Sequence, residues 1–211
     1  MKKILTAILF LISIHSYGQS LLFNPTFYKS DYNHFKNPIG LEIAYFHPIK
    51  KRAQLGVSFN QNFFRKTFSY NYSSLNDGKS YDRTVKAKNN ISSITLSFEI
   101  DLLRKKNSSL FFGPMISLNN LERDELILDV FSEKNTNSIS ASTINKTKPN
   151  RLGTGLNFKF QQRLNNQFGI FAKINPAVIF YRNPDLVGTP DPSIISFTNF
   201  GIGINYNFQR K

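Results

Sequence analysis

The sequence predicts an all-β fold: a transmembrane, antiparallel, up-and-down β-barrel of about eight strands, preceded by an N-terminal signal peptide. Three observations predict it. The chain opens with a secretory leader, apolar and polar residues alternate along most of the rest, and the connections between alternating segments are short and long in turn. The chain has no cysteine, which excludes a disulfide framework and any thiol-based metal site or nucleophile.

The leader occupies the first 18 residues. Lys2 and Lys3 form a basic start, residues 4–14 form an apolar run, and small residues at Ser16 and Gly18 precede the expected cleavage before Gln19. The apolar run is too short to span a bilayer as a helix, which needs about 20 residues. We therefore expect a signal peptide over residues 1–18 and one barrel domain over residues 19–211, with a buried N-terminal helix as the alternative.

Seven segments alternate with a period of two, which is the signature of a β-strand because successive side chains point to opposite faces. In the last of them, Phe200, Ile202 and Ile204 share one face, and the glycines and asparagines between them share the other. In chain order the seven segments cover residues 39–45, 55–59, 94–102, 110–118, 152–160, 168–174 and 200–208.

An eighth strand is expected over residues 21–32, although Pro25 interrupts its pattern. Bacterial barrels formed by one chain have an even number of strands, with both ends on the periplasmic side. A barrel of seven strands would leave an open edge in lipid, where each unpaired backbone group costs several kcal/mol.

The connections alternate in length, as they do in such barrels. Residues 48–52, 104–107 and 164–166 form tight turns, whereas residues 65–90, 119–150 and 183–193 are long and polar. We expect the tight turns in the periplasm and the long connections outside the cell. Phe68, Tyr70 and Tyr72 continue an alternation, which points to strand extensions above the membrane.

A soluble β-sandwich also alternates, so the composition of the two faces must separate the alternatives. One face is aliphatic and aromatic with almost no charge, which suits lipid; the other is rich in Gly, Ser, Ala and Asn, which suits a narrow lumen. We place Tyr45, Phe63, Phe64, Phe180 and Tyr181 near strand ends, where an aromatic girdle is expected. The barrel is favoured over a secreted sandwich or a lipocalin-like barrel.

The C-terminal strand resembles the signal read by the barrel-assembly machinery of outer membranes. The resemblance is carried by Gly203, Ile204, Tyr206 and Phe208, although three more residues follow the aromatic one. In pattern and length the segment after the leader resembles the small outer-membrane β-barrel proteins of the Bacteroidota, the PorT-like group. This resemblance implies a Gram-negative source, the cell outer membrane as location, and outer-membrane lipid, lipopolysaccharide and the assembly machinery as partners.

Charged residues on the small-residue face form the main candidate site. Burying a charge inside a narrow barrel requires a partner of opposite sign. We expect a salt-bridge network that fills the lumen, with a polar path for ions or a proton as the alternative. The expected network consists of Glu42, Glu99, Asp101, Lys159 and Lys173.

The net charge of +14 raises the question of nucleic acid, but the basic residues sit in short groups such as residues 50–52 and 104–106. We interpret these groups as turns that face anionic headgroups, and expect no nucleic-acid partner. The basic segment 65–90 could contact lipopolysaccharide, polysaccharide or a protein.

No motif predicts a catalytic residue, a metal site or a cofactor, so we do not expect an enzyme. The sequence favours a structural or interaction barrel that works through its external loops, with an unknown envelope protein as a possible partner. One alternative is a lipid-modifying enzyme in which His34, near Ser30 and Asp31, is the base, because His47 falls beside a periplasmic turn. The other alternative is a narrow pore.

Overall fold

The computed structural model describes residues 19–31, 36–73, 79–133, 136–147, 150–180 and 194–208, so the predicted signal peptide lies outside the described residues. That part of the chain contains no helix long and apolar enough to cross a membrane. The described residues form nine strands: β1 (Ser20–Ser30), β2 (Ile39–Lys50), β3 (Ala53–Ser73), β4 (Ser80–Arg104), β5 (Ser108–Glu133), β6 (Thr136–Thr147), β7 (Arg151–Arg163), β8 (Phe168–Phe180) and β9 (Ile194–Asn207).

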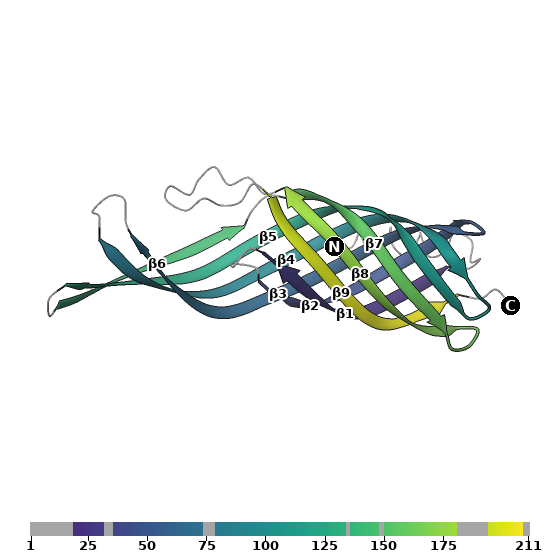
Figure 1. Ribbon diagram of the computed structural model, residues 1–211, viewed down its shortest axis with the longest axis horizontal. Helices are drawn as coiled ribbons and strands as arrows, with labels where there is room; N and C mark the ends of the chain where they lie inside the picture. The colour runs from purple at the N-terminus through teal and green to yellow at the C-terminus, as the bar shows by residue number, and fades with distance from the viewer. Residues whose placement is uncertain are drawn as a thin grey trace, which may run out of the picture.

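Eight strands close into a ring in the order β1-β2-β3-β4-β5-β7-β8-β9, and every neighbouring pair is antiparallel (Figure 1). The predicted antiparallel barrel of eight strands is confirmed. The ring closes where β1 pairs with β9, with Ser20 opposite Asn207 and Ser30 opposite Phe197. This seam is interrupted beside Asn24 and Pro25, since proline has no N–H to donate to the ladder.

The two ends of the barrel differ. The tight turns between β2 and β3, β4 and β5, and β7 and β8 lie at one end, together with the start of β1 and the end of β9. We call this the turn end. At the opposite end, β3, β4 and β5 continue past the ring, and we call it the projecting end (Figure 1).

The extension is a sheet of four strands. The first half of β5 pairs with β7 and belongs to the ring, whereas residues 122–133 pair with β6. Beyond the ring, residues 64–73 of β3, 80–90 of β4, 122–133 of β5 and the whole of β6 form what we call the projecting sheet (Figure 1). The expectation that residues 65–90 and 119–150 are mainly loops was therefore wrong, and the extension suggested by Phe68, Tyr70 and Tyr72 is present.

The two faces of the ring are distributed as in a protein surrounded by lipid. The apolar side chains of the alternating pattern point outward and are exposed: 46% of Phe23, 58% of Ile39 and 71% of Ile202. Polar side chains point inward and are buried, as Asn24 and Asn205 are. A water-soluble sandwich would show the opposite arrangement, because apolar surface is unfavourable in water. The structure is that of a transmembrane barrel.

Two apolar layers cross the inside of the barrel. One contains Leu22, Ala44, Phe46 and Phe171 and lies toward the turn end. The other lies toward the projecting end, and its buried members, against which Tyr28 packs, are Ile91, Leu121, Ile179, Ile195 and Phe197.

One residue of the expected aromatic girdle faces the other way. Phe63 and Phe180 point outward, but Phe64 is 3% exposed and packs with Val85, Ala87 and Ile127 at the base of the projecting sheet. Adjacent residues of a strand cannot share a face, so only one of Phe63 and Phe64 can lie in a girdle. Tyr181 lies outside the described residues.

Candidate functional site in the barrel lumen

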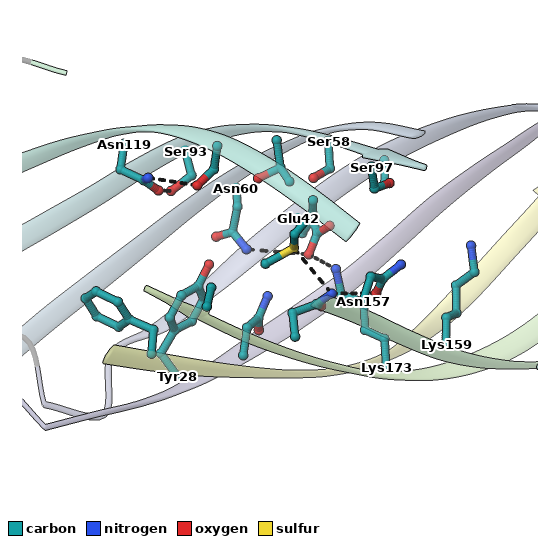
Figure 2. A pocket seen from close by; sticks show the side chains of 18 of the residues that line it. Tyr28, Glu42, Ser58, Asn60, Ser93, Ser97, Asn119, Asn157, Lys159 and Lys173 are labelled. Carbon is teal, nitrogen blue, oxygen red and sulfur yellow. Dashed lines mark hydrogen bonds and ion pairs between the residues drawn. The ribbon is translucent and has the colours of Figure 1, made fainter. Parts of the chain in front are cut away.

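The centre of the lumen contains two ion pairs between strands that are far apart in the sequence. Lys173 on β8 donates to Glu42 on β2 (Figure 2). Lys159 on β7 contacts Glu99 on β4, with 2.7 Å between Nζ and Oε2. All four side chains are buried. The structure thus brings together four of the five residues expected to form a lumen network.

Hydrogen bonds complete the coordination of both carboxylates. Glu99 accepts from Gln54 at 2.7 Å and from Asn157, and Glu42 accepts from Asn60 at 3.5 Å. The Lys159 ammonium also lies over two aromatic rings, 3.4 Å from the centre of Phe46 and 4.7 Å from that of Phe111. The carboxylate and the two ring faces offset part of the cost of burying this ammonium.

Small polar side chains continue the network toward the projecting end. Thr26 donates to Asn62 at 2.9 Å, and Ser93 donates to Asn119 at 2.7 Å, which in turn donates to Ser117 at 2.8 Å. These hydrogen bonds tie β1 to β3 and β4 to β5 on the inner side of the barrel wall.

Little space remains between these side chains. The central cavity has a volume of about 60 Å³, which holds only a few water molecules. Apolar layers lie on both sides of it. This arrangement suits a filled lumen that braces the barrel wall, rather than a continuous polar path for ions.

Asp101 is separate from this network. It faces inward at the turn end, is 4% exposed, and its Oδ1 has no hydrogen-bond partner among the described residues. The cavity that it borders also adjoins the basic turns.

The sequence analysis missed a buried ion pair at the projecting end. Arg123 and Glu125 pair at 2.8 Å, and Asn89 donates to Glu125 at 2.6 Å. Both charged side chains are almost fully buried, although they lie in a segment expected to be a loop. Arg123 and Glu125 alternate along the sequence in step with the buried residues Leu121 and Ile127. This period of two could have identified the pair as inward-facing strand residues.

The inward face of the projecting sheet combines aromatic and charged groups. Arg83 binds Asp129 through two contacts of 2.7 Å and lies 4.3 Å from the centre of the Tyr72 ring. Hydrogen bonds from Arg83 hold the pKa of Asp129 below its ordinary value, and desolvation raises the pKa of Tyr72. Tyr72 also stacks on Tyr81, with 5.4 Å between ring centres. These contacts brace a sheet that lies outside the barrel wall.

The predicted assembly signal forms part of the seam strand. Tyr206 contacts both Phe168 and Phe208 edge-on, and the backbone N–H of Phe208 donates to the carbonyl of Gln19. Gly203 lies close against the neighbouring strand β1, because a Cβ there would lie 2.2 Å from the carbonyl oxygen of Phe23. Ile204 points outward and is exposed.

The histidine hypothesis gains no support from the geometry. His34 lies outside the described residues. His47 lies at the turn end, with its Nδ1 3.5 Å from Nε2 of Gln19. Within the described ranges, no group of three or more His, Cys, Asp or Glu side chains could hold a metal ion.

No protein-family model and no curated protein sequence matches this chain. Solved structures do match. The crystal structure of Neisserial surface protein A is similar with a TM-score of 0.60, at 12% identity, over 92% of this chain and 99% of that one. This chain has the fold of a small outer-membrane β-barrel protein. OprH of P. aeruginosa is similar with a TM-score of 0.46, at 14% identity, over 91% of this chain and 100% of its own. Ail of Yersinia pestis is similar with a TM-score of 0.43, at 13% identity, over 90% of this chain and 95% of its own.

Proposed function

We propose that this chain is an exported outer-membrane protein whose barrel is a closed anchor and whose projecting sheet binds a partner outside the cell. The observation that carries the proposal is the combination of a filled lumen with a long sheet that extends beyond the barrel wall. A barrel used for transport would need a continuous path, and the centre of this one is occupied by paired charges.

The orientation follows from the connections. Outer-membrane barrels keep their short turns and both chain ends in the periplasm. The turn end would therefore lie in the periplasm and the projecting sheet outside the cell. The leader over residues 1–18 supports export, and the pattern and length support a place among the PorT-like barrels of the Bacteroidota. The glycine at Gly203 and the aromatic positions after it support insertion by the barrel-assembly machinery.

The free edge of β6 supports strand addition as the binding mode. Among the described residues, β6 pairs with β5 alone, so its other edge presents backbone donors and acceptors. From Thr136 to Asn145 it contains neither proline nor a charged residue. Proteins usually protect long edges with such residues. An extended segment of another protein could continue this sheet, as in other cases of recognition by strand addition.

Lipopolysaccharide is a second proposed contact, at the base of the projecting sheet. Arg65 and Lys88 lie directly opposite each other across β3 and β4, and Lys86 follows on the same outward face. Like charges in cross-strand positions are unfavourable unless an anion lies between them. The apolar belt ends beside them at Phe63, which supports a position at headgroup height for the three.

Two experiments test the proposal. The first compares gel mobility of the outer-membrane fraction before and after boiling. A shift supports a closed barrel in the outer membrane, whereas protein found in the soluble fraction contradicts it.

The second experiment places a photo-crosslinking amino acid at Ala141 on the β6 edge in whole cells. The matched control is the same amino acid at Thr84, which lies on central strand β4. We expect a protein adduct at Ala141 only. Lysine at Ile139 should suppress it, because charge on an edge opposes strand addition. Equal adducts at both positions would contradict binding through the edge.

A further inference from the structure

The turn end of the barrel opens into a basic cup. This cavity of about 430 Å³ lies within the size range of small-ligand sites. Three different turns contribute its basic side chains, which are Lys50, Lys51, Arg52, Lys105, Lys106 and Arg163. Among the described residues that line it, Asp101 is the one acid.

The cup faces the lumen, which removes it from the lipid that surrounds the barrel. Its wall includes the inward-facing residues Gln54, Phe111 and Gln161, and the ring of Phe111 separates it from Lys159 deeper in the barrel. Lipid headgroups would contact the outer side of the wall. The expectation that these turns face headgroups leaves open the role of the side chains that gather inside the cup.

The floor of the cup contains an acceptor without a partner. Asp101 is 4% exposed, and its Oδ1 has no hydrogen bond within the described part of the chain. The backbone N–H of Asp101 donates to the carbonyl of Arg52 at 2.8 Å, so the position of the residue in the wall is fixed. A buried acceptor left unsatisfied in this way is unfavourable until a donor reaches it.

We propose that the basic cup binds an acidic peptide segment presented from the periplasmic side. The carboxylates of such a segment would meet the ring of lysines and arginines, and a peptide N–H would donate to Asp101. A ligand with both groups satisfies the cup, whereas a pure polyanion leaves the Oδ1 of Asp101 without a donor. Several like charges around a concave site raise the local concentration of an oppositely charged ligand.

The test measures binding of a fluorescein-labelled tetraglutamate peptide to the full mature protein in detergent micelles, by anisotropy at low salt. Lys105→Gln together with Lys106→Gln should weaken binding about tenfold. The matched control removes the same charge from the projecting end of the ring, through Lys29→Gln and Lys36→Gln, and should change binding less than about twofold. All four positions are exposed, and gel mobility before and after boiling verifies that each variant folds.

The role of Asp101 is tested by competition with tripolyphosphate, which has comparable charge but no peptide N–H. We expect the wild-type protein to prefer the peptide, and Asp101→Asn to shift the balance toward tripolyphosphate about tenfold. The proposal would be overturned if the control variant lost as much peptide binding as the Lys105 and Lys106 variant. It would also be overturned if tripolyphosphate bound the wild-type protein as tightly as the peptide does. A cell-wall fragment that displaces the probe more effectively than the acidic peptide would overturn the identity of the occupant.

Discussion

The ion pair between Glu99 and Lys159 permits a quantitative test of what holds the lumen together. The two side chains are 0% and 1% exposed and lie 2.7 Å apart. Removal of one partner from a buried pair leaves an uncompensated charge, which typically costs 3–5 kcal/mol, roughly. We take the lower part of that range, because the adjacent cavity of about 60 Å³ can admit water to the remaining charge.

Three variants form a double-mutant cycle. Glu99→Gln should destabilise the barrel by about 3 kcal/mol, since the ammonium of Lys159 stays buried without its counter-ion. Lys159→Met should cost about 4 kcal/mol, because it also removes the contacts of the ammonium with Phe46 and Phe111. The double variant should cost no more than either single one, since the new amide can still bind Gln54 and Asn157.

The assay is urea unfolding of the mature protein in lipid vesicles, compared at constant m-value. Lys88→Met, an exposed position on the projecting sheet, is the control and should stay within about 0.5 kcal/mol of the wild type. The reasoning is refuted if the double variant loses the sum of the two single losses to within about 0.5 kcal/mol, because independent sites add in that way.

Three further predictions concern the seam and the projecting sheet. Gly203→Ala should impair folding more than Gly201→Ala, because the new methyl group meets a backbone carbonyl at Gly203 but a movable side chain at Gly201. The measurement is the fraction of protein whose gel mobility changes on boiling. Phe64→Ala should open the projecting sheet to protease, with a loss of about 3 kcal/mol. Arg83 lowers the pKa of Asp129, so the ion pair between them contributes fully to the stability of the projecting sheet above about pH 4. That stability is lost as the pH falls further, and pepsin should therefore attack the sheet only below that pH.

Each of these has a control. Equal folding yields for the two glycine variants would contradict the tight seam. Phe63→Ala, on the lipid side, should leave the protease pattern of the sheet unchanged. Asp129→Asn should remove the difference in pepsin cleavage between pH 5 and pH 3, and a difference that persists would show that another group controls it.

The ring could be predicted because lipid imposes a strict rule on each residue. Outward positions such as Ile39 and Ile202 must be apolar, and inward positions must fit a narrow polar space. The alternation is therefore visible over whole strands. The identity of the charged partners is not, because Glu42 and Lys173 meet only through the way the ring closes. Which acid faces which base depends on the stagger of all eight strands.

The projecting sheet was harder to recognise because water surrounds it. In β3, Ser69 and Asn71 alternate with Tyr70 and Tyr72, a pattern far weaker than that of a membrane strand. β6 has almost no apolar residues, and Ile139, one of its few, is exposed. Its strand structure comes from pairing with β5, which is tertiary context that a single segment does not encode.

The seam between β1 and β9 also bears on the order in which the protein can fold. Ser20 and Asn207 stand opposite each other, yet they are separated by nearly all of the described chain. The loss of chain entropy on joining two ends grows with the number of residues between them, so this contact is the most difficult to form early. We expect hairpins to accumulate first as a curved, open sheet, and closure of the circle to come last. During that interval both terminal strands expose unpaired backbone, and helper proteins that hold such edges apart would have most influence on the yield of finished barrels.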